Sequence, residues 1–304
     1  MNAPRQLDLG FVGLGQIGGV MAARLIGAGV RLHVYDPRAE AAQALVDAGA
    51  IAAASPKAVA DAATIVFASL PNNEVSEQVA AEVAAGARLR HYVEMSTIGR
   101  QCMETIASTL GARRIGSVDA PVTGGVPGAL RGTLSIMVSG APADRDAVMP
   151  WLGKIGGKLT VLGDEPGQAQ VMKLVCNLVV AANMVAASEG LAMGAKAGLD
   201  PEKMLALLNS GTARSAATSD ILPDAVLTRT FAFGARTSII DKDVRLGLSQ
   251  AEHLGVPSPV IAAAADIWQA AGARDDLRDD DFTAIIRLVE QAAGTHIGNR
   301  QAGN

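Results

Sequence analysis

The spacing of hydrophobic and polar positions changes about half-way along this chain. In the first half, short runs rich in Val, Ile, Leu, Tyr and Phe alternate with alanine-rich stretches such as 20–28 and 38–48. This strand–helix–strand order predicts an α/β fold with a parallel, doubly wound sheet and helices on both of its faces. The expected strands lie at 7–13, 31–36, 64–71, 91–97, 116–122, 133–140 and 158–163.

The second half has a helical pattern and no convincing strand. From about Glu165 onward the apolar positions predict long helices. Pro166 fits the first turn of the first of them, and a helix of about 28 residues from Gly167 would be roughly 40 Å long. We therefore expect a doubly wound domain at 1–165 and an all-helical domain at 166–304, which begins with a long interdomain helix.

One apolar stretch has the length of a membrane span. Between Leu174 and Ala195 the only charged residue is Glu189. Two asparagines and a serine interrupt the stretch, and neither an aromatic belt nor a cluster of positive charge flanks it. We expect the buried helix of a soluble protein and no membrane partner.

Composition narrows the class of partner. The net charge is −4 and no basic run is present, which argues against a nucleic-acid partner. The two cysteines, Cys102 and Cys176, and the four histidines form no metal-ligand pattern, so we expect no metal. The start of the chain does not have the pattern of a signal peptide, and a reduced, cytoplasmic protein is the simplest interpretation.

A glycine loop follows the first expected strand. Gly13, Gly15 and Gly18 form the G-x-G-x-x-G pattern at the start of a helix, with Leu14, Gln16 and Ile17 between them. This spacing allows a tight turn, lets the backbone approach a pyrophosphate and places that anion at a helix N-terminus. The second strand ends in Asp36, which fits the acidic residue that binds the adenosine ribose. The pattern predicts a Rossmann domain.

Asp36 also bears on the choice of cofactor. A carboxylate repels a 2′-phosphate and therefore favours NAD. Arg38 can pair with such a phosphate, so NADP stays possible.

Further candidates follow later strands. Leu70, Pro71 and Thr97 come directly after two strands, at the edge where ligands of such sheets bind. Thr123, Gly124 and Gly125 form a loop with a hydroxyl and two open N–H groups that suits a carboxylate. Turn formation and helix capping explain these residue types equally well. Lys242 lies between Asp241 and Asp243, where a solvated charge cluster is the default interpretation.

Taken together, four ordered segments resemble the β-hydroxyacid dehydrogenase family, to which 3-hydroxyisobutyrate dehydrogenase belongs. The resemblance covers nearly the whole chain. The segments are "GLGQIGGVMAARL", with Ile17 where methionine is more usual; "DAPVTGGVPGALRGTLSIMVSG", with Thr123 where serine is commoner; "GQAQVMKLVCN", with Ala169 where a glycine is usual; and "DKDVRLG".

The resemblance implies residue roles. Lys173 is the implied catalytic residue, and Asn177 together with the loop 123–125 is implied to hold the substrate. Thr97 and Lys242 are implied to reach the cofactor. On a helix, Lys173 and Asn177 are one turn apart and face the same side. A lysine can accept the hydroxyl proton if burial or a nearby cation such as Lys242 lowers its pKa.

We therefore expect an NAD(P)-dependent oxidoreductase that interconverts a small 3-hydroxy acid and its semialdehyde, with Lys173 as general acid and base. Relatives that act on tartronate or succinic semialdehyde, or on a sugar acid such as threonate, share the motifs. Imine reductases share the fold but generally lack the lysine. A dinucleotide-binding sensor would need the glycine loop but not Lys173. The alanine-rich helical half favours a homodimer or homotetramer.

Overall fold

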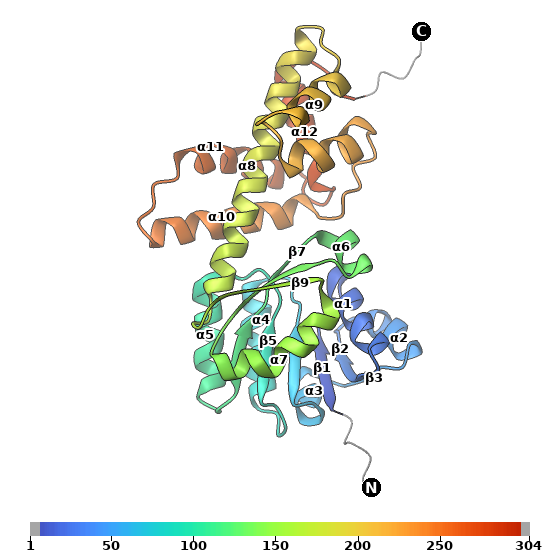
Figure 1. The fold of residues 1–304 in the computed structure, drawn as a ribbon, viewed down its shortest axis with the longest axis vertical. Coiled ribbons are helices and arrows are strands. Elements are labelled where there is room, and N and C mark those ends of the chain that lie inside the picture. Colours follow the sequence, from blue (N-terminus) through green and yellow to red (C-terminus); the bar gives the residue numbers. More distant parts are fainter. Residues whose placement is uncertain (1–6, 299–304) are drawn as a thin grey trace. The chain divides into compact units, whose positions relative to one another are not determined.

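The computed structural model describes residues 7–298. The chain forms two compact units, one up to Lys173 and one from Leu174 onward (Figure 1). Each unit has its own hydrophobic core, so the two are described separately.

The first unit contains a nine-stranded sheet. Its strand order is β3-β2-β1-β4-β5-β6-β8-β7, and β9 pairs with β8. The strands are β1 (Asp8–Val12), β2 (Arg31–Tyr35), β3 (Ile51–Ala52), β4 (Ile65–Ala68), β5 (His91–Glu94), β6 (Gly116–Asp119), β7 (Val122–Thr123), β8 (Ser135–Ser139) and β9 (Lys158–Gly163). The neighbours from β3 to β6 are parallel, with Leu9 opposite Leu32 on one side and Ile65 on the other.

Helices cover both faces of this sheet (Figure 1). They are α1 (Gln16–Gly27), α2 (Ala39–Asp47), α3 (Pro56–Ala62), α4 (Asn73–Ala84), α5 (Gly99–Gly111), α6 (Gly125–Arg131) and α7 (Pro142–Ile155). Because successive strand residues point to opposite faces, Phe11 joins the core beneath α1 and α7, and Val12 joins the core beneath α3, α4 and α5. Fully buried Met21, Leu25 and Met103 fill these two cores.

The prediction of a purely parallel sheet is wrong at one edge. Strand β8 is antiparallel to both β6 and β7, with Val122 opposite Ile136. Only two residues separate β6 from β7, and only α6 lies between β7 and β8. The chain therefore turns back at this edge, and the sheet is mixed.

The second unit is helical. It contains most of α8 (Gln168–Lys196), followed by α9 (Pro201–Ser210), a π-helix at Ala217–Leu227, α10 (Thr237–His253), α11 (Pro259–Gly272), a 3-10 turn at Phe282–Ile285 and α12 (Ile286–Ala293). Its core is built around Trp268, Met184 and Leu222, which are fully buried. The indole N–H of Trp268 donates to the carbonyl of Ala181, which ties α11 to α8.

Helix α8 begins at Gln168, one residue later than predicted. Gly167 has φ +92°, a left-handed conformation that cannot continue a right-handed helix. Pro166 therefore lies before the helix and not in its first turn.

By length and composition α8 is also a candidate membrane span, and 33% of its most apolar stretch is buried. Leu178, Met184 and Leu191 belong to the core of the helical unit, whereas Val175, Val179 and Met193 are exposed. We interpret α8 as a core helix with one exposed apolar side.

Candidate active site

The glycine loop has the geometry that a dinucleotide needs. Gly13 has φ +88°, and a Cβ at this position would collide with the backbone carbonyl of Ser69. A Cβ at Gly18 would collide with the carbonyl of Gly13, whereas Gly15 faces open space. Gly15 precedes α1, and no side chain caps that helix. The open position at Gly15 and the uncapped start of α1 are the features that the close approach of a pyrophosphate requires.

The residues between the glycines differ in exposure. Leu14 is buried, Gln16 is exposed and Ile17 is half-buried against the core. Gly13 donates its N–H to the carbonyl of Tyr35 at 2.9 Å, which holds the turn on β2.

Asp36 lies directly beside this loop. Its Oδ2 accepts a hydrogen bond from the backbone N–H of Leu14 at 2.8 Å. Arg38 donates to both carboxylate oxygens, Nε at 3.0 Å and Nη2 at 3.1 Å, and its backbone N–H adds a third bond. Burial alone would raise the pKa of Asp36, but these hydrogen bonds outweigh it and the pKa is lowered. The structure thus brings Asp36 and the glycine loop together as predicted from the motif.

The candidate residues after β4 and β5 lie in loops that are bonded to each other. Leu70 donates its backbone N–H to Oγ of Ser96 at 2.6 Å. Pro71 is exposed and Thr97 is half-buried, each next to one end of this bond. Glu94, at the end of β5, is fully buried and accepts from the N–H of Ser96 at 2.9 Å.

The loop at Thr123, Gly124 and Gly125 joins β7 to α6. Gly124 has φ +121° and Gly125 has φ +61°, so both positions require the conformational freedom of glycine. Thr123 is half-buried and ends β7, opposite Ser135. The segment is therefore a strand-to-helix loop and not a two-residue hairpin.

Lys173 and Asn177 lie one turn apart on α8, and both are half-buried. The amide of Asn177 donates to Oδ2 of Asp243 at 2.6 Å. Oδ1 of the same carboxylate lies 3.1 Å from Nζ of Lys242. The structure therefore links Lys242 to the predicted substrate residue Asn177 through Asp243, which is only 3% exposed.

The first turn of α8 is fixed by two buried strand residues. Asp119 on β6 accepts from the N–H groups of Gly167 and Gln170, each at 3.1 Å. Ser139 on β8 donates to Asp119 at 2.6 Å and accepts from the N–H of Ala169 at 2.8 Å. Burial raises the pKa of the Asp119 carboxyl, although these hydrogen bonds oppose the rise.

Comparisons with known proteins match both halves of this architecture. Residues 8–163 match the family described as the NAD binding domain of 6-phosphogluconate dehydrogenase, and residues 167–289 match NAD-binding of NADP-dependent 3-hydroxyisobutyrate dehydrogenase. The chain is 32% identical to 2-(hydroxymethyl)glutarate dehydrogenase of Eubacterium barkeri, over 98% of this chain and 99% of that one. It is 32% identical to 2-hydroxy-3-oxopropionate reductase of Escherichia coli, over 94% and 98% of the two chains.

A solved structure agrees with these relatives. The 3-hydroxyisobutyrate dehydrogenase of Mycobacterium tuberculosis, determined with L-serine, shares 30% identity and a TM-score of 0.85, over 93% of this chain and 99% of that one. The chain belongs to the β-hydroxyacid dehydrogenase family.

Membership in the β-hydroxyacid dehydrogenase family confirms the prediction that this chain is an NAD(P)-dependent hydroxyacid dehydrogenase. The relatives named above are dehydrogenases and a reductase, which argues against a dinucleotide sensor. The fit of the glycine loop to a pyrophosphate agrees with the matched dinucleotide-binding family. Among residues 7–298, no cluster of His, Cys, Asp and Glu could hold a metal ion.

The sequence does not reveal every contact in the candidate site of this dehydrogenase. Asp243 stands within the motif "DKDVRLG", where the sequence indicates only a charge beside Lys242. Ser96 directly precedes the predicted residue Thr97 and Gln170 lies three residues before Lys173, yet nothing in their spacing reveals the hydrogen bonds that they make. Asp119 could have been suspected because a carboxylate inside an expected strand needs a partner.

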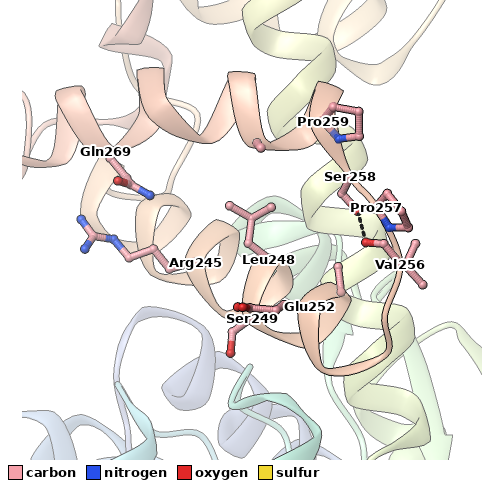
Figure 2. A pocket seen from close by; sticks show the side chains of 11 residues that line it. Arg245, Leu248, Ser249, Glu252, Val256, Pro257, Ser258, Pro259 and Gln269 are labelled. Atoms are coloured by element: carbon pink, nitrogen blue, oxygen red, sulfur yellow. Dashed lines mark hydrogen bonds between the residues drawn. The ribbon is translucent and has the colours of Figure 1, made fainter.

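Two cavities lie in the helical unit. A cavity of about 40 Å³ is lined by Asn177 and by apolar side chains of Val180, Ala181, Met184, Ile240, Trp268 and Phe282. A larger open one of about 750 Å³ lies between α10 and α11, with Arg245 and Gln269 at one end and Val256 and Pro257 at the other (Figure 2). The larger cavity contains none of the predicted site residues, so the smaller one is the candidate for substrate recognition.

Proposed function

We propose that this dehydrogenase oxidises a small 3-hydroxy acid to its semialdehyde, and catalyses the reverse reduction, with Lys173 as general acid and base. The observation that carries the proposal is the cluster of Asn177, Asp243 and Lys242. Asn177 lies one helical turn after Lys173 on α8, and the other two residues lie on α10. Bound NAD(P) would supply the hydride acceptor for oxidation and the hydride donor for reduction. The glycine loop 13–18, Asp36, Leu70, Pro71 and Thr97 would hold this cofactor, and Lys242 would reach it.

The substrate carboxylate would bind at the loop 123–125 and at Asn177. The two left-handed glycines leave the backbone N–H groups of that loop sterically open to an anion. Asp243 orients the Asn177 amide by accepting from its nitrogen, and the amide held in this orientation would hydrogen-bond the substrate. Lys242 compensates the buried Asp243 carboxylate, which is a positioning role.

Lys173 would exchange a proton with the substrate hydroxyl. In oxidation the neutral amine accepts the hydroxyl proton while the hydride leaves the carbinol carbon. In reduction the ammonium returns that proton to the developing alkoxide. General acid–base assistance of this kind typically contributes a factor of about 10² to 10⁴ to the rate.

The small cavity beside Asn177 favours a substrate with a small apolar substituent. Its other lining side chains are apolar, and a water molecule there would find few of the two to four polar partners it needs. An alkyl group gains from burial in such a space. A polyhydroxylated acid such as threonate would leave hydroxyl groups without partners.

We also propose domains at 1–165 and 166–304, a cytoplasmic location and a homodimer or homotetramer. The two family matches lie on either side of the proposed domain boundary. The chain has only two cysteines, Cys102 and Cys176, and such sparse use of cysteine suits a reducing compartment. Exposed apolar side chains such as Val179 and Met193 on α8 support self-association.

The experiment is a panel of initial rates with NAD and with NADP. The substrates are 3-hydroxyisobutyrate, 3-hydroxypropionate, glycerate, 4-hydroxybutyrate, serine and threonate. We expect the highest kcat/KM for 3-hydroxyisobutyrate, which carries a methyl group. Ala181→Leu would fill the cavity and should reduce kcat/KM for 3-hydroxyisobutyrate roughly tenfold relative to 3-hydroxypropionate. A highest rate with threonate or glycerate, or an unchanged ratio in Ala181→Leu, would contradict the assignment.

A further inference from the structure

Gln170 lies three residues before Lys173 on α8 and is fully buried. We propose that Gln170 is a positioning residue that couples the cofactor-binding loops to the helix that carries Lys173. The inference rests on the proposed function, in which Lys173 moves the proton and Thr97 contacts the cofactor.

One side chain fixes the backbone on both sides of Thr97. Oε1 of Gln170 accepts from the N–H groups of Ile98 at 3.0 Å and Gly99 at 3.3 Å. Nε2 donates to the carbonyl of Ser96 at 3.0 Å. Helix α5 starts at Gly99 and its own N-cap residue, Ile98, provides no side-chain cap. Gln170 therefore supplies that cap from α8.

The connection continues into the loop after β4. Oγ of Ser96 accepts the 2.6 Å hydrogen bond from Leu70, so the carbonyl and the hydroxyl of one serine join two cofactor loops to Gln170. The backbone N–H of Gln170 is itself bonded to Asp119. A buried polar chain of this kind, with its donors and acceptors matched, fixes the relative positions of the groups that it joins. A displacement of Gln170 should therefore disturb cofactor binding and the placement of Lys173 together.

The amide chemistry at this position is specific. Gln170 accepts with one terminal atom and donates with the other, and a carboxylate can only accept. In a Gln170→Glu variant the ionised form would place an oxygen against the carbonyl of Ser96, whereas the protonated form can still donate to it. The titratable and charged groups near this site are Glu94, Asp119, Tyr92, Cys102, Arg100 and Lys173. Burial and the two neighbouring carboxyls should raise the pKa of the introduced group, and the N–H groups of Ile98 and Gly99 oppose this rise without cancelling it, so we expect its ionisation to become visible in enzyme assays.

The experiment measures kcat, the KM for the hydroxy acid and the Kd for NADH by fluorescence between pH 5.5 and 8.5. Gln170→Glu is compared with Gln170→Met, an apolar variant of similar size, and with Gln168→Glu as matched control. Gln168 lies on the same helix, and its Oε1 accepts from the N–H of Glu165, which a carboxylate can also do. We expect Gln170→Glu to resemble the wild type at low pH. As pH rises, its Kd for NADH should increase about tenfold while kcat falls in parallel.

The controls separate coupling from general loss of structure. Gln170→Met should bind NADH weakly at every pH, with no additional ionisation, and Gln168→Glu should follow the wild type. A Gln170→Glu enzyme with wild-type Kd and kcat across the pH range would overturn the proposal. If this variant does not fold, normal NADH binding and turnover in Gln170→Met would overturn it equally.

The same measurements, made also on Lys173→Met, distinguish this inference from the proposed function. Should Lys173→Met keep its turnover while Gln170→Glu still loses NADH with rising pH, the role of Lys173 fails and the link to the cofactor loops stands. Should Lys173→Met be inactive and Gln170→Glu be normal, the coupling alone fails.

Discussion

The carboxylate of Asp36 lies between two groups that a bound cofactor would also contact. Its oxygens accept from Leu14 in the glycine loop and from the guanidinium of Arg38. Arg38 is 57% exposed at its side chain, so it can turn away when a ribose hydroxyl takes its place, or stay and pair with a 2′-phosphate. We therefore expect the choice between NAD and NADP to depend on the charge at residue 36.

Asp36→Asn tests this choice at a single position. The amide removes the negative charge but keeps an oxygen for the N–H of Leu14, so the loop should hold its shape. We expect the ratio of kcat/KM for NAD over NADP to fall about tenfold, because the repulsion of a 2′-phosphate is lost. Steady-state kinetics with both cofactors measure the ratio. A loss of equal size for both cofactors would show that Asp36 supports the loop and does not select the cofactor.

At the scale of the elements, strand β5 carries a carboxyl into the interior of the sheet. Glu94 is fully buried, accepts from the hydroxyl of Tyr92 at 3.0 Å and from the N–H of Ser96 at 2.9 Å. Burial raises the pKa of Glu94 above its ordinary value of 4.5, although the hydrogen bonds from Ser96 and Tyr92 oppose the rise. The strand end is therefore held by a carboxyl group whose preference is to keep its proton to a higher pH than an exposed glutamate does.

This preference predicts a pH dependence of stability. Above pH 4.5 the unfolded chain releases the Glu94 proton while the folded chain still holds it, so the free energy of unfolding falls as pH rises toward the folded pKa. The side chain of Glu94→Gln cannot release a proton. Over that pH range the unfolding free energy of the wild type should therefore fall relative to that of the variant. Urea unfolding from pH 4.5 upward measures it. A difference that is constant with pH would contradict the assignment.

The elements also show which features of the fold can be predicted from the sequence. β1, α1 and β2 follow from alternation, the glycine spacing and the apolar helix face, because these patterns are local. The antiparallel direction of β8 does not follow, since alternation of side chains says nothing about which neighbour a strand joins. β3 has two residues, too few for any period.

In the candidate site, the glycine loop could be predicted because its spacing carries its chemistry, whereas the roles of Lys173 and Asn177 come from the resemblance of their segment to the family and stay predictions. The hydrogen bonds of Gln170 and Asp119 could not be predicted, since they join residues 20 to 74 positions apart. Such pairings depend on which strand ends become neighbours in the completed sheet. The periodic pattern of apolar residues along the chain carries no information about that.

At the scale of the whole molecule, one helix carries the two residues on which the proposed chemistry depends. Lys173 ends the first compact unit and Asn177 belongs to the second, and both lie on α8. The first turn of α8 is held by Asp119 and Ser139 of the sheet. Further along, Asn177 is held by Asp243 of α10. The central claim is that this anchored helix presents Lys173 for proton transfer.

The most direct test measures kcat of Lys173→Met with the best hydroxy acid of the panel, together with its Kd for NADH. Lys196→Met, near the other end of α8, is the matched control, since Lys196 is exposed and bonds to the carbonyl of Ala293. We predict that kcat of Lys173→Met falls by about 10² to 10⁴ while NADH binding stays within about twofold, and that Lys196→Met keeps its activity. A Lys173→Met enzyme that turns over at the wild-type rate would contradict the account.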